Sequence, residues 1–209
     1  MSHLCTMNAV VLAGGKNSRI NRKKAFIRIN SQTIIEKTVR LLQNQFNRVL
    51  IISNERDDFT RFSLPVIPDI IKNKGPLGGI YTGLQASDTH HTFFVACDMP
   101  FLKEHVITAL IEQAEGYDVV IPEHLGYLEP LCAIYSQTCI PVISKNLNTG
   151  QLKIKTILND VRVKKIVWNE SDICCEEGTF FNINTNHDLL TALKYAKQQV
   201  PVPVIASGR

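Results

Sequence analysis

Short apolar runs alternate along this chain with segments in which apolar residues recur every three or four positions. The runs lie at residues 9–12, 49–52, 92–97, 118–121 and 131–135. They are rich in β-branched or aromatic residues and are bounded by polar stretches, a pattern that predicts strands buried on both faces.

Three intervening segments predict amphipathic helices. Apolar residues recur at near-helical spacing in residues 34–46 and 103–115, and such a stripe is typical of a helix that covers a core. A third helix is expected at residues 186–198, with Thr185 or Asn186 as its N-cap.

This alternation predicts an α/β fold with a mostly parallel sheet. Ligands of such sheets bind outside the carboxyl ends of the strands, and the chemically distinctive segments follow Leu12, surround Asp69 and follow Cys97. A chain of 209 residues predicts one domain, here over residues 1–199, followed by an extended tail at 200–209.

Composition narrows the class of protein. Apolar residues make up 44% of the chain and the net charge is +4, which suits a soluble globular protein with a phosphorylated ligand but is too weak to indicate nucleic-acid binding. The polar N-terminus lacks a signal-peptide core, and the six cysteines form no C-x-x-C pair. We therefore expect a cytoplasmic protein with reduced thiols.

The first distinctive motif is Leu-Ala-Gly-Gly at residues 12–15, which is followed by the cations Arg19 and Lys24. Small residues let the backbone turn tightly and approach a ligand, and N–H groups with long cationic side chains suit the phosphates of a nucleoside triphosphate. The spacing matches neither the dinucleotide fingerprint nor the P-loop. A glycine-rich turn with incidental surface charges remains the alternative.

Asp98 comes directly after the predicted strand at 92–97, and Pro100 follows it. A carboxylate at the tip of a strand is well placed to hold Mg²⁺, which prefers oxygen ligands and usually keeps waters while it bridges substrate phosphates. Alternatively, Asp98 caps the helix that begins near Lys103.

Asp69 follows a short apolar run and precedes Gly-Pro-Leu-Gly-Gly at residues 75–79. Gly78 and Gly79 at the mouth of a helix would let a flat base approach the backbone. The Asp69 carboxylate could then accept from the N1–H and N2–H₂ groups of guanine, or it could cap the following turn.

Residues 180–185, Phe-Phe-Asn-Ile-Asn-Thr, predict a strand with Asn182 and Asn184 on one face. Asparagine is unfavourable in strands, so the pair indicates either contact with a metal shell or phosphate, or a turn into the last helix. Glu129, at the start of another predicted strand, could contact substrate or simply be exposed.

Five motifs occur together in a familiar order. They are Leu-Ala-Gly-Gly with Arg and Lys at 12–24, Gly-Pro-Leu-Gly-Gly at 75–79, Cys-Asp-Met-Pro at 97–100, Glu-Pro-Leu at 129–131 and Phe-Asn-Ile-Asn-Thr at 181–185. Over roughly residues 8–198 the chain resembles the molybdenum cofactor guanylyltransferases, also called molybdopterin-guanine dinucleotide biosynthesis protein A. The motifs of Lys24 and Asp98 are shared by many nucleotidyltransferases, whereas Gly-Pro-Leu-Gly-Gly indicates the guanylyl branch.

The resemblance implies a three-layer, Rossmann-like nucleotidyltransferase domain that transfers GMP from GTP to the terminal phosphate of molybdenum-molybdopterin, with Mg²⁺ as cofactor and pyrophosphate as product. It implies GTP and the acceptor as partners, with transient contact with molybdenum-insertion proteins and molybdoenzyme chaperones. It implies no role for nucleic acid or membrane.

The resemblance also implies roles for individual residues. Arg19, Lys24 and Asp98 would be catalytic, with Asp98 also the metal ligand. The nucleotide would be bound by Leu12, Ala13, Gly14, Gly15, Lys24, Asp69, Gly78 and Asp98. Asn182 and Asn184 occupy motif positions with less defined roles, and Lys153 and Lys155 are candidates for the acceptor site.

The sequence departs from the family pattern at Asn21, where glycine is usual, and at Lys23, where Asp or Asn is usual. The Lys23 change sets a second cation beside Lys24. Two alternatives follow: a related transferase that uses CTP or a sugar-phosphate acceptor, and a catalytically weakened GTP-binding partner protein.

Overall fold

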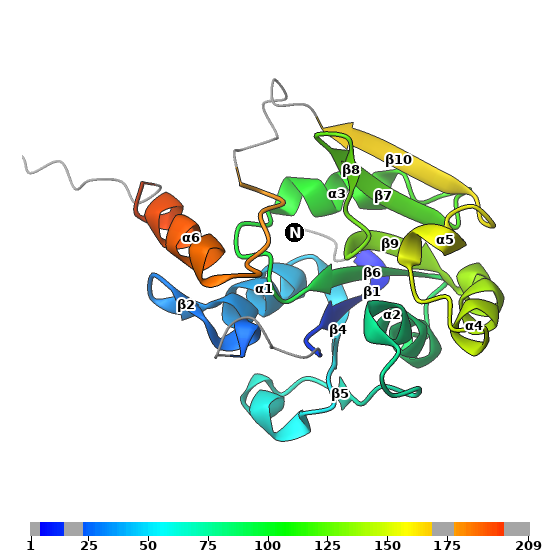
Figure 1. Cartoon of the computed structure of the whole chain (residues 1–209), viewed down its shortest axis with the longest axis horizontal. Helices are drawn as coiled ribbons and strands as arrows, with labels where there is room; N and C mark the ends of the chain where they lie inside the picture. The colour runs from blue at the N-terminus through cyan, green and yellow to red at the C-terminus, as the bar shows by residue number, and fades with distance from the viewer. Residues whose placement is uncertain (1–4, 15–22, 169–177, 199–209) are drawn as a thin grey trace, which may run out of the picture.

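The computed structural model describes residues 5–14, 23–168 and 178–198. An eight-stranded sheet forms its centre, with the strand order β10-β7-β9-β6-β1-β4-β5 and β8 paired to β7 (Figure 1). The strands are β1 (Cys5–Leu12), β4 (Phe46–Ile52), β5 (Val66–Ile67), β6 (His91–Ala96), β7 (Val119–His124), β8 (Tyr127–Leu128), β9 (Cys132–Ser136) and β10 (Val163–Trp168).

The sheet is mostly parallel, as the alternation of elements predicted. β1 is parallel to β4 and β6, β4 to β5, and β10 to β7. The exception is β9, which runs antiparallel to both β6 and β7, while β8 forms a hairpin with β7.

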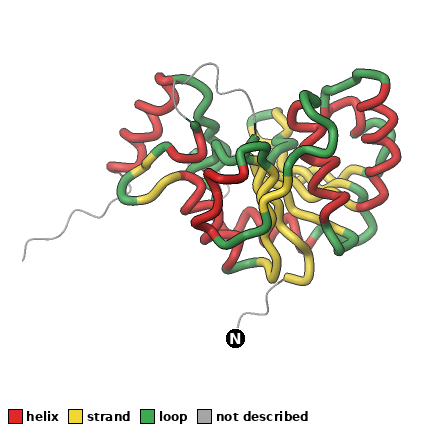
Figure 2. The backbone as a smooth tube through the Cα atoms, turned by 90° about the horizontal axis from the view of Figure 1, so that it is seen from below, coloured by secondary structure: helices red, strands yellow, loops and turns green. Residues whose placement is uncertain are grey.

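Helices cover both faces of the sheet and give three layers (Figure 2). One buried cluster contains side chains of α1 (Ile34–Gln43) and α3 (Glu104–Glu112). The second contains side chains of α2 (Gly75–Ala86), α4 (Ile140–Asn148) and α5 (Ile154–Ile157). Each helix therefore directs its apolar stripe at the face that it covers.

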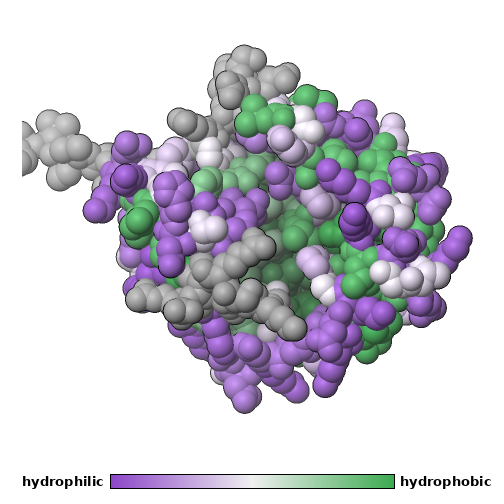
Figure 3. All heavy atoms as spheres, viewed as in Figure 1, coloured by the Kyte–Doolittle hydropathy of each residue, from purple (hydrophilic) through white to green (hydrophobic). Residues whose placement is uncertain are grey.

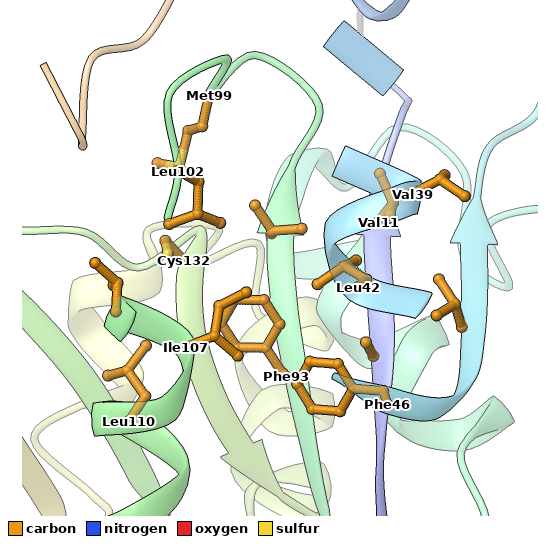
Figure 4. Close-up of a cluster of buried hydrophobic side chains, with 14 of the residues drawn as sticks. Val11, Val39, Leu42, Phe46, Phe93, Met99, Leu102, Ile107, Leu110 and Cys132 are labelled. Atoms are coloured by element: carbon orange, nitrogen blue, oxygen red, sulfur yellow. The ribbon is translucent and has the colours of Figure 1, made fainter. Parts of the chain in front are cut away.

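The α1 helix shows how the sequence determines where a helix begins and ends. Thr33 and Glu36 form a capping box that defines its N-terminus. The helix buries Val39 and Leu42 against β1 and β6 (Figure 4). It ends at Gln43, earlier than the predicted 46, because Phe46 begins β4 and stacks on Phe93 of β6 with 5.6 Å between ring centroids.

A smaller third cluster joins the β2–β3 region to α6. The hairpin of β2 (Arg28–Ile29) and β3 (Gln32–Thr33) packs against α6 (Asn186–Gln198), which has the predicted bounds. This cluster includes Ile27, Ile29, Ile34, Phe101, Ile183 and Ala192. Three short 3-10 helices complete the described elements: η1 (Lys24–Phe26), η2 (Arg56–Phe62) and η3 (Gln137–Cys139).

The prediction of a strand at residues 180–185 is wrong. Residues 178–180 form a turn and the next four an irregular segment. Its amides bond elsewhere than to a neighbouring strand: Phe181 N–H donates to the Gly178 carbonyl at 2.9 Å and Ile183 N–H to the Asp98 carbonyl at 3.0 Å. Asn182 and Asn184 are therefore placed by loop contacts and not by the alternation of a strand.

Within the described ranges no helix combines the length and hydropathy needed to span a membrane. Among the described residues, Cys132 and Cys139 are buried free thiols and Cys97 is a partly buried one. The predicted tail at 200–209 lies outside the described residues.

Candidate functional site

The loops that follow β1, β4, β5 and β6 lie side by side at one edge of the sheet, because these neighbouring strands are parallel. Backbone hydrogen bonds join the loops: Ala13 N–H donates to the Ile52 carbonyl at 3.0 Å, and Cys97 N–H to the Leu12 carbonyl at 3.1 Å. The edge therefore brings together the first motif and the segment that carries Asp98. The face seen in Figure 3 is hollowed near its centre, with hydrophobic side chains in the hollow and polar ones around it.

Lys24, Asp98 and Asn184 meet at this edge from three distant parts of the sequence. Lys24, the first residue of η1, donates from Nζ to Asp98 Oδ2 at 3.1 Å and to Asn184 Oδ1 at 2.7 Å. The Lys24 and Asp98 side chains are 21% and 17% exposed, so water reaches the pair only in part. A half-desolvated ammonium beside a carboxylate is well suited to bind a phosphate group.

One carboxylate oxygen of Asp98 is left for a ligand. Asp98 Oδ1 is buried and has no hydrogen-bond partner among the described residues, although unsatisfied buried oxygens are rare in folded proteins. The alternative role as a helix cap does not hold, since α3 begins at Glu104 with Lys103 as its N-cap. An oxygen of this kind fits a divalent cation.

Glu129 joins the same site, a role that its sequence context left open. The Asn182 side chain donates to the Phe180 carbonyl at 3.1 Å and also hydrogen-bonds Glu129. Burial raises the pKa of Glu129 to about 7; the negative charge of Asp98 adds to this effect and the Asn182 bond opposes it.

Asp69 is held by a residue that the sequence analysis missed. Asn54 donates from Nδ2 to Asp69 Oδ2 at 2.8 Å, and Asn54 Oδ1 accepts from the Asp69 backbone N–H at 3.2 Å. This reciprocal pair fixes the carboxylate between the loops after β4 and β5. The position of Asn54 in the sequence could have identified it, because Asn54 stands two residues beyond a buried strand, as Asp98 does.

The glycines of α2 bring this helix close to the end of β1. Gly78 and Gly79 are buried in its first turns. A Cβ atom on Gly79 would lie 3.0 Å from Leu12 Cδ2 and 4.0 Å from Asp69 Oδ1, and one on Gly78 would lie 2.8 Å from Lys74 Cβ. Leu12, Asp69 and Gly79 are thus neighbours, and the approach of a base to this backbone stays a prediction.

The remaining predicted residues divide into three groups. Gly15, Arg19 and Asn21 lie outside the described residues. Lys23 points away from Lys24 and pairs with Glu55 at 2.7 Å and with Asp58, both near η2, and these two carboxylates raise its pKa. Lys153 and Lys155 are exposed at α5, where no described contact links them to Asp98.

Comparison with known proteins shows the family to which this chain belongs. The MobA-like NTP transferase domain matches residues 9–165. A probable molybdenum cofactor guanylyltransferase of Pelotomaculum thermopropionicum is 35% identical over 184 residues, which cover 88% of this chain and 90% of that protein. The molybdenum cofactor guanylyltransferase of Desulfosudis oleivorans is 33% identical over 188 residues, or 88% and 92% of the two chains.

Solved structures agree with the sequence relatives. Molybdopterin-guanine dinucleotide biosynthesis protein A from Archaeoglobus fulgidus superposes with a TM-score of 0.80 at 27% identity, covering 92% of this chain and all of that one. A nucleotidyl transferase from Methanothermobacter thermautotroptrophicus shares the fold at 17% identity with a TM-score of 0.74, covering 93% and 99% of the two chains. This chain is therefore a nucleotidyltransferase of the MobA-like family, and within that family it belongs with the molybdenum cofactor guanylyltransferases.

Proposed function

We propose that this protein transfers GMP from GTP to the terminal phosphate of molybdenum-molybdopterin, forming the guanine dinucleotide cofactor and releasing pyrophosphate. The observation that carries the proposal is the meeting of Lys24, Asp98 and Asn184 beside an Asp98 oxygen that has no hydrogen-bond partner within the described ranges. The names of the relatives support GTP and the molybdenum cofactor as the substrates.

The reaction is a direct in-line displacement. An oxygen of the acceptor's terminal phosphate forms a bond to the α-phosphorus of GTP, and the bond from that phosphorus to the β-phosphate oxygen breaks. Such a transfer asks the protein mainly for positioning and charge compensation. Lys24 and Arg19, with the backbone amides of Gly14 and Gly15, hold the triphosphate and the departing pyrophosphate.

No side-chain nucleophile takes part in this proposal. Cys97 is the thiol next to Asp98, and burial raises its pKa to about 12, with the Asp98 charge adding to the effect. A thiol of this kind stays protonated at neutral pH and is a poor nucleophile. The acceptor phosphate, by contrast, is already ionised.

Asp98 is the residue that would hold Mg²⁺, and this assignment is supported by its Oδ1 atom, to which no described residue forms a hydrogen bond. Among the described residues no group of three or more His, Cys, Asp or Glu side chains forms a metal cage. Substrate phosphates and water would therefore supply the other ligands, which is usual for this ion. When bound, Mg²⁺ stabilises the negative charge that develops on the phosphate oxygens.

Asp69 would recognise the base. Its carboxylate can accept from the two donors on the Watson–Crick edge of guanine, and the Asn54 pair holds it in place for that purpose. Cytosine and adenine lack this pair of donors. A single domain over residues 1–199, a cytoplasmic location, and transient contact with molybdenum-insertion proteins and molybdoenzyme chaperones belong to the same proposal.

The test is a calorimetric titration of the full chain with GTP, CTP, ATP and UTP, each with and without Mg²⁺. We expect selective GTP binding that weakens at least about tenfold in Asp69→Asn, since a hydrogen bond to a charged group is worth about 1.5–3 kcal/mol. Asp160→Asn, which removes an exposed carboxylate on the loop after α5, is the matched control.

Other outcomes would identify the alternatives. Preference for CTP would reject the guanylyl assignment in favour of a cytidylyl enzyme. Selective GTP binding without pyrophosphate release in the presence of acceptor would reject catalysis in favour of a GTP-binding partner protein.

A further inference from the structure

We propose that the acceptor binds with its pterin ring on the β7–β8 hairpin, where Glu129 accepts hydrogen bonds from the edge of the ring and Tyr127 stacks on its face. This inference rests on the proposed function, because that function makes a pterin the acceptor. It assigns an acceptor site beside the nucleotide site, built from residues that take no part in binding GTP.

The hairpin places Tyr127 and Glu129 on one face of the sheet. Tyr127 pairs with His124, and the ladder continues where the Glu129 N–H donates to the Pro122 carbonyl at 2.9 Å. Residues two apart on a strand share a face and are separated by about 7 Å. The two residues of the turn both have positive φ, 51° and 78°, as a tight hairpin requires. The hairpin therefore presents both side chains in the same direction.

One end of the segment before α6 packs on this same face. The centroid of the His124 ring lies 5.4 Å from that of Phe180. Two residues further along, the Asn182 side chain hydrogen-bonds Glu129. Because Tyr127 pairs with His124 and stands two residues from Glu129, it lies next to both contacts.

The other end of the segment before α6 reaches the catalytic edge (Figure 1). Ile183 N–H donates to the Asp98 carbonyl at 3.0 Å, and Asn184 Oδ1 accepts from Lys24 Nζ at 2.7 Å. The charge of Asp98 also acts on the Glu129 carboxyl group. An acceptor whose phosphate lies at Lys24 and Asp98 can therefore extend along this segment and place its ring on the hairpin.

Glu129 is suited to recognise the edge of a pterin. The 2-amino-4-oxo end of that ring carries two neighbouring N–H donors, and a carboxylate can accept from both at once. The Glu129 side chain is partly buried and hydrogen-bonds Asn182, while no cation of the described ranges pairs with it. Donors on the ring would compensate the carboxylate and fix the orientation of the acceptor.

Tyr127 supplies an aromatic surface for the face of the ring. It is 70% exposed, whereas its neighbours Trp168 and Phe180 are 5% and 7% exposed. An exposed aromatic side chain stacks on flat heteroaromatic rings without requiring a particular pattern of donors. Tyr127 therefore adds affinity for the ring, and Glu129 adds selectivity for its edge.

The experiment measures binding of a pterin phosphate to the full chain. The probe is 6-hydroxymethylpterin phosphate, whose ring fluorescence allows an anisotropy titration. α,β-Methylene-GTP and Mg²⁺ are present, so that the nucleotide site is occupied and no transfer occurs. The comparison probe is 6-hydroxymethyllumazine phosphate, in which a carbonyl group replaces the 2-amino donor.

The variants at Glu129 test recognition of the edge. Wild type should bind the pterin at least about tenfold more tightly than the lumazine, because the lumazine loses one hydrogen bond to a charged group. Glu129→Gln should weaken pterin binding at least about tenfold and abolish this preference. Glu123→Gln is the matched control: Glu123 lies on the opposite face of the same hairpin, paired with Lys165 at 3.2 Å, and its loss should leave binding unchanged.

The variants at Tyr127 test stacking. Tyr127→Ala should weaken binding of both probes at least about fivefold and leave the preference between them unchanged. Tyr127→Phe keeps the aromatic ring and should bind both probes as wild type does. Circular dichroism checks that each variant is folded.

Three results would overturn the inference. They are failure of the pterin phosphate to bind, wild-type binding in both Glu129→Gln and Tyr127→Ala, and loss of pterin binding in Asp69→Asn, which would place the pterin in the base site. Loss of calorimetric Mn²⁺ binding in Glu129→Gln with GTP present would also overturn it, by making Glu129 a metal ligand.

Failure of the proposed function gives a different result. A wild-type protein that does not bind the GTP analogue, or that releases no pyrophosphate from GTP with molybdopterin, contradicts GMP transfer. The pterin titrations would still report on the hairpin in that case, so the two proposals are tested separately.

Discussion

Two adjacent lysines show how strongly position decides the role of a residue. Lys24 reaches Asp98 and Asn184 in the site, whereas Lys23 turns outward to Glu55 and Asp58. The sequence suggested that a cation at 23 would disturb the phosphate loop. In the structure two carboxylates compensate that charge, so its effect on Lys24 is smaller than the sequence alone implied.

A matched pair of variants tests this division. Lys24→Gln should reduce turnover at least about a hundredfold, since it removes the charge that the proposed mechanism places against phosphate oxygens in the transition state. Lys23→Gln should leave turnover within about threefold, because exposed ion pairs contribute little. Pyrophosphate release at saturating GTP measures both, and similar losses in the two variants would contradict the assignment.

Asp98→Asn separates the metal role from folding. The amide keeps the shape of the side chain but removes the charge that favours a divalent cation. We expect turnover to be largely abolished and calorimetric Mn²⁺ binding in the presence of GTP to be lost, with an unchanged circular dichroism spectrum. Full turnover in the variant would rule out the metal assignment.

The raised pKa of Glu129 predicts an unusual pH dependence of stability. Its folded pKa is about 7, above the ordinary value of 4.5, so the folded state holds a proton that the unfolded chain releases. This carboxyl group therefore costs stability as the pH rises from about 4.5 through 7. Glu129→Gln should raise the melting temperature relative to wild type at pH 8 in metal-free buffer.

At pH 3 the same substitution should change the melting temperature little, because the carboxyl group is then protonated almost fully in both states. A difference between wild type and variant that does not depend on pH would show that Glu129 ionises normally. Glu115→Gln, at an exposed position beyond α3, controls for the loss of a carboxylate elsewhere.

At the scale of elements, hydrophobic patterning predicted most strands and helices, but it did not predict local exceptions. The α6 helix has the expected bounds because its apolar stripe and first-turn Asp188 are local signals. Phe46 was assigned to a helix because its spacing fits one, whereas its pairing with β1 and its stacking on Phe93 place it in a strand. That contact joins residues far apart in sequence and cannot be seen in a local pattern.

The candidate site, like the strands and helices, was predicted in part from the sequence. Lys24, Asp69 and Asp98 were identified by their places after buried strands, and the structure brings Lys24 and Asp98 into contact. The geometry of Asn182 and Asn184 was not predicted, because an irregular segment that hydrogen-bonds to Asp98 and Gly178 replaces the expected strand. Asn54 was missed, and its partnership with Asp69 depends on the pairing of β4 with β5.

The packing of α2 on the sheet gives a prediction for a whole element. A Cβ atom on Gly83 would lie 2.4 Å from Phe94 Cε1 and 3.2 Å from Val10 Cγ1. Both side chains are fully buried, so Gly83→Ala must push the helix away from β1 and β6. We expect a loss of about 1–3 kcal/mol in the free energy of unfolding by urea denaturation.

The control in the same helix is Gln85→Ala. This side chain is exposed, and alanine has the higher helix propensity, so stability should be unchanged or slightly higher. If Gly83→Ala were equally harmless, α2 would have more freedom to shift on the sheet than its close contact indicates.

At the scale of the whole molecule, a polar clamp joins three segments away from the catalytic edge. Asp118 accepts from Arg162 Nε at 3.1 Å, from Arg162 Nη2 at 3.0 Å and from Thr138 Oγ1 at 2.8 Å. These contacts connect the start of β7 with η3 and with the segment before β10. The Arg162 guanidinium holds the pKa of Asp118 well below its usual range.

A carboxyl group whose pKa is lowered on folding stabilises the folded state when the pH is above the pKa of the unfolded chain. That contribution is lost as the pH falls toward the pKa of the folded state. Asp118→Asn should therefore cost about 1–3 kcal/mol at pH 7. The difference from wild type should shrink below pH 4, as urea denaturation at both pH values would show. Turnover per folded molecule should stay normal, and a selective loss of turnover would instead place Asp118 in the site.

The contacts of Lys24 also have a consequence for synthesis on the ribosome. Its two partners lie 74 and 160 residues further along the chain. The central strands β1, β4 and β6 are synthesised long before Asn184. A nascent chain can therefore form the middle of its sheet while Lys24 still lacks one of its two partners.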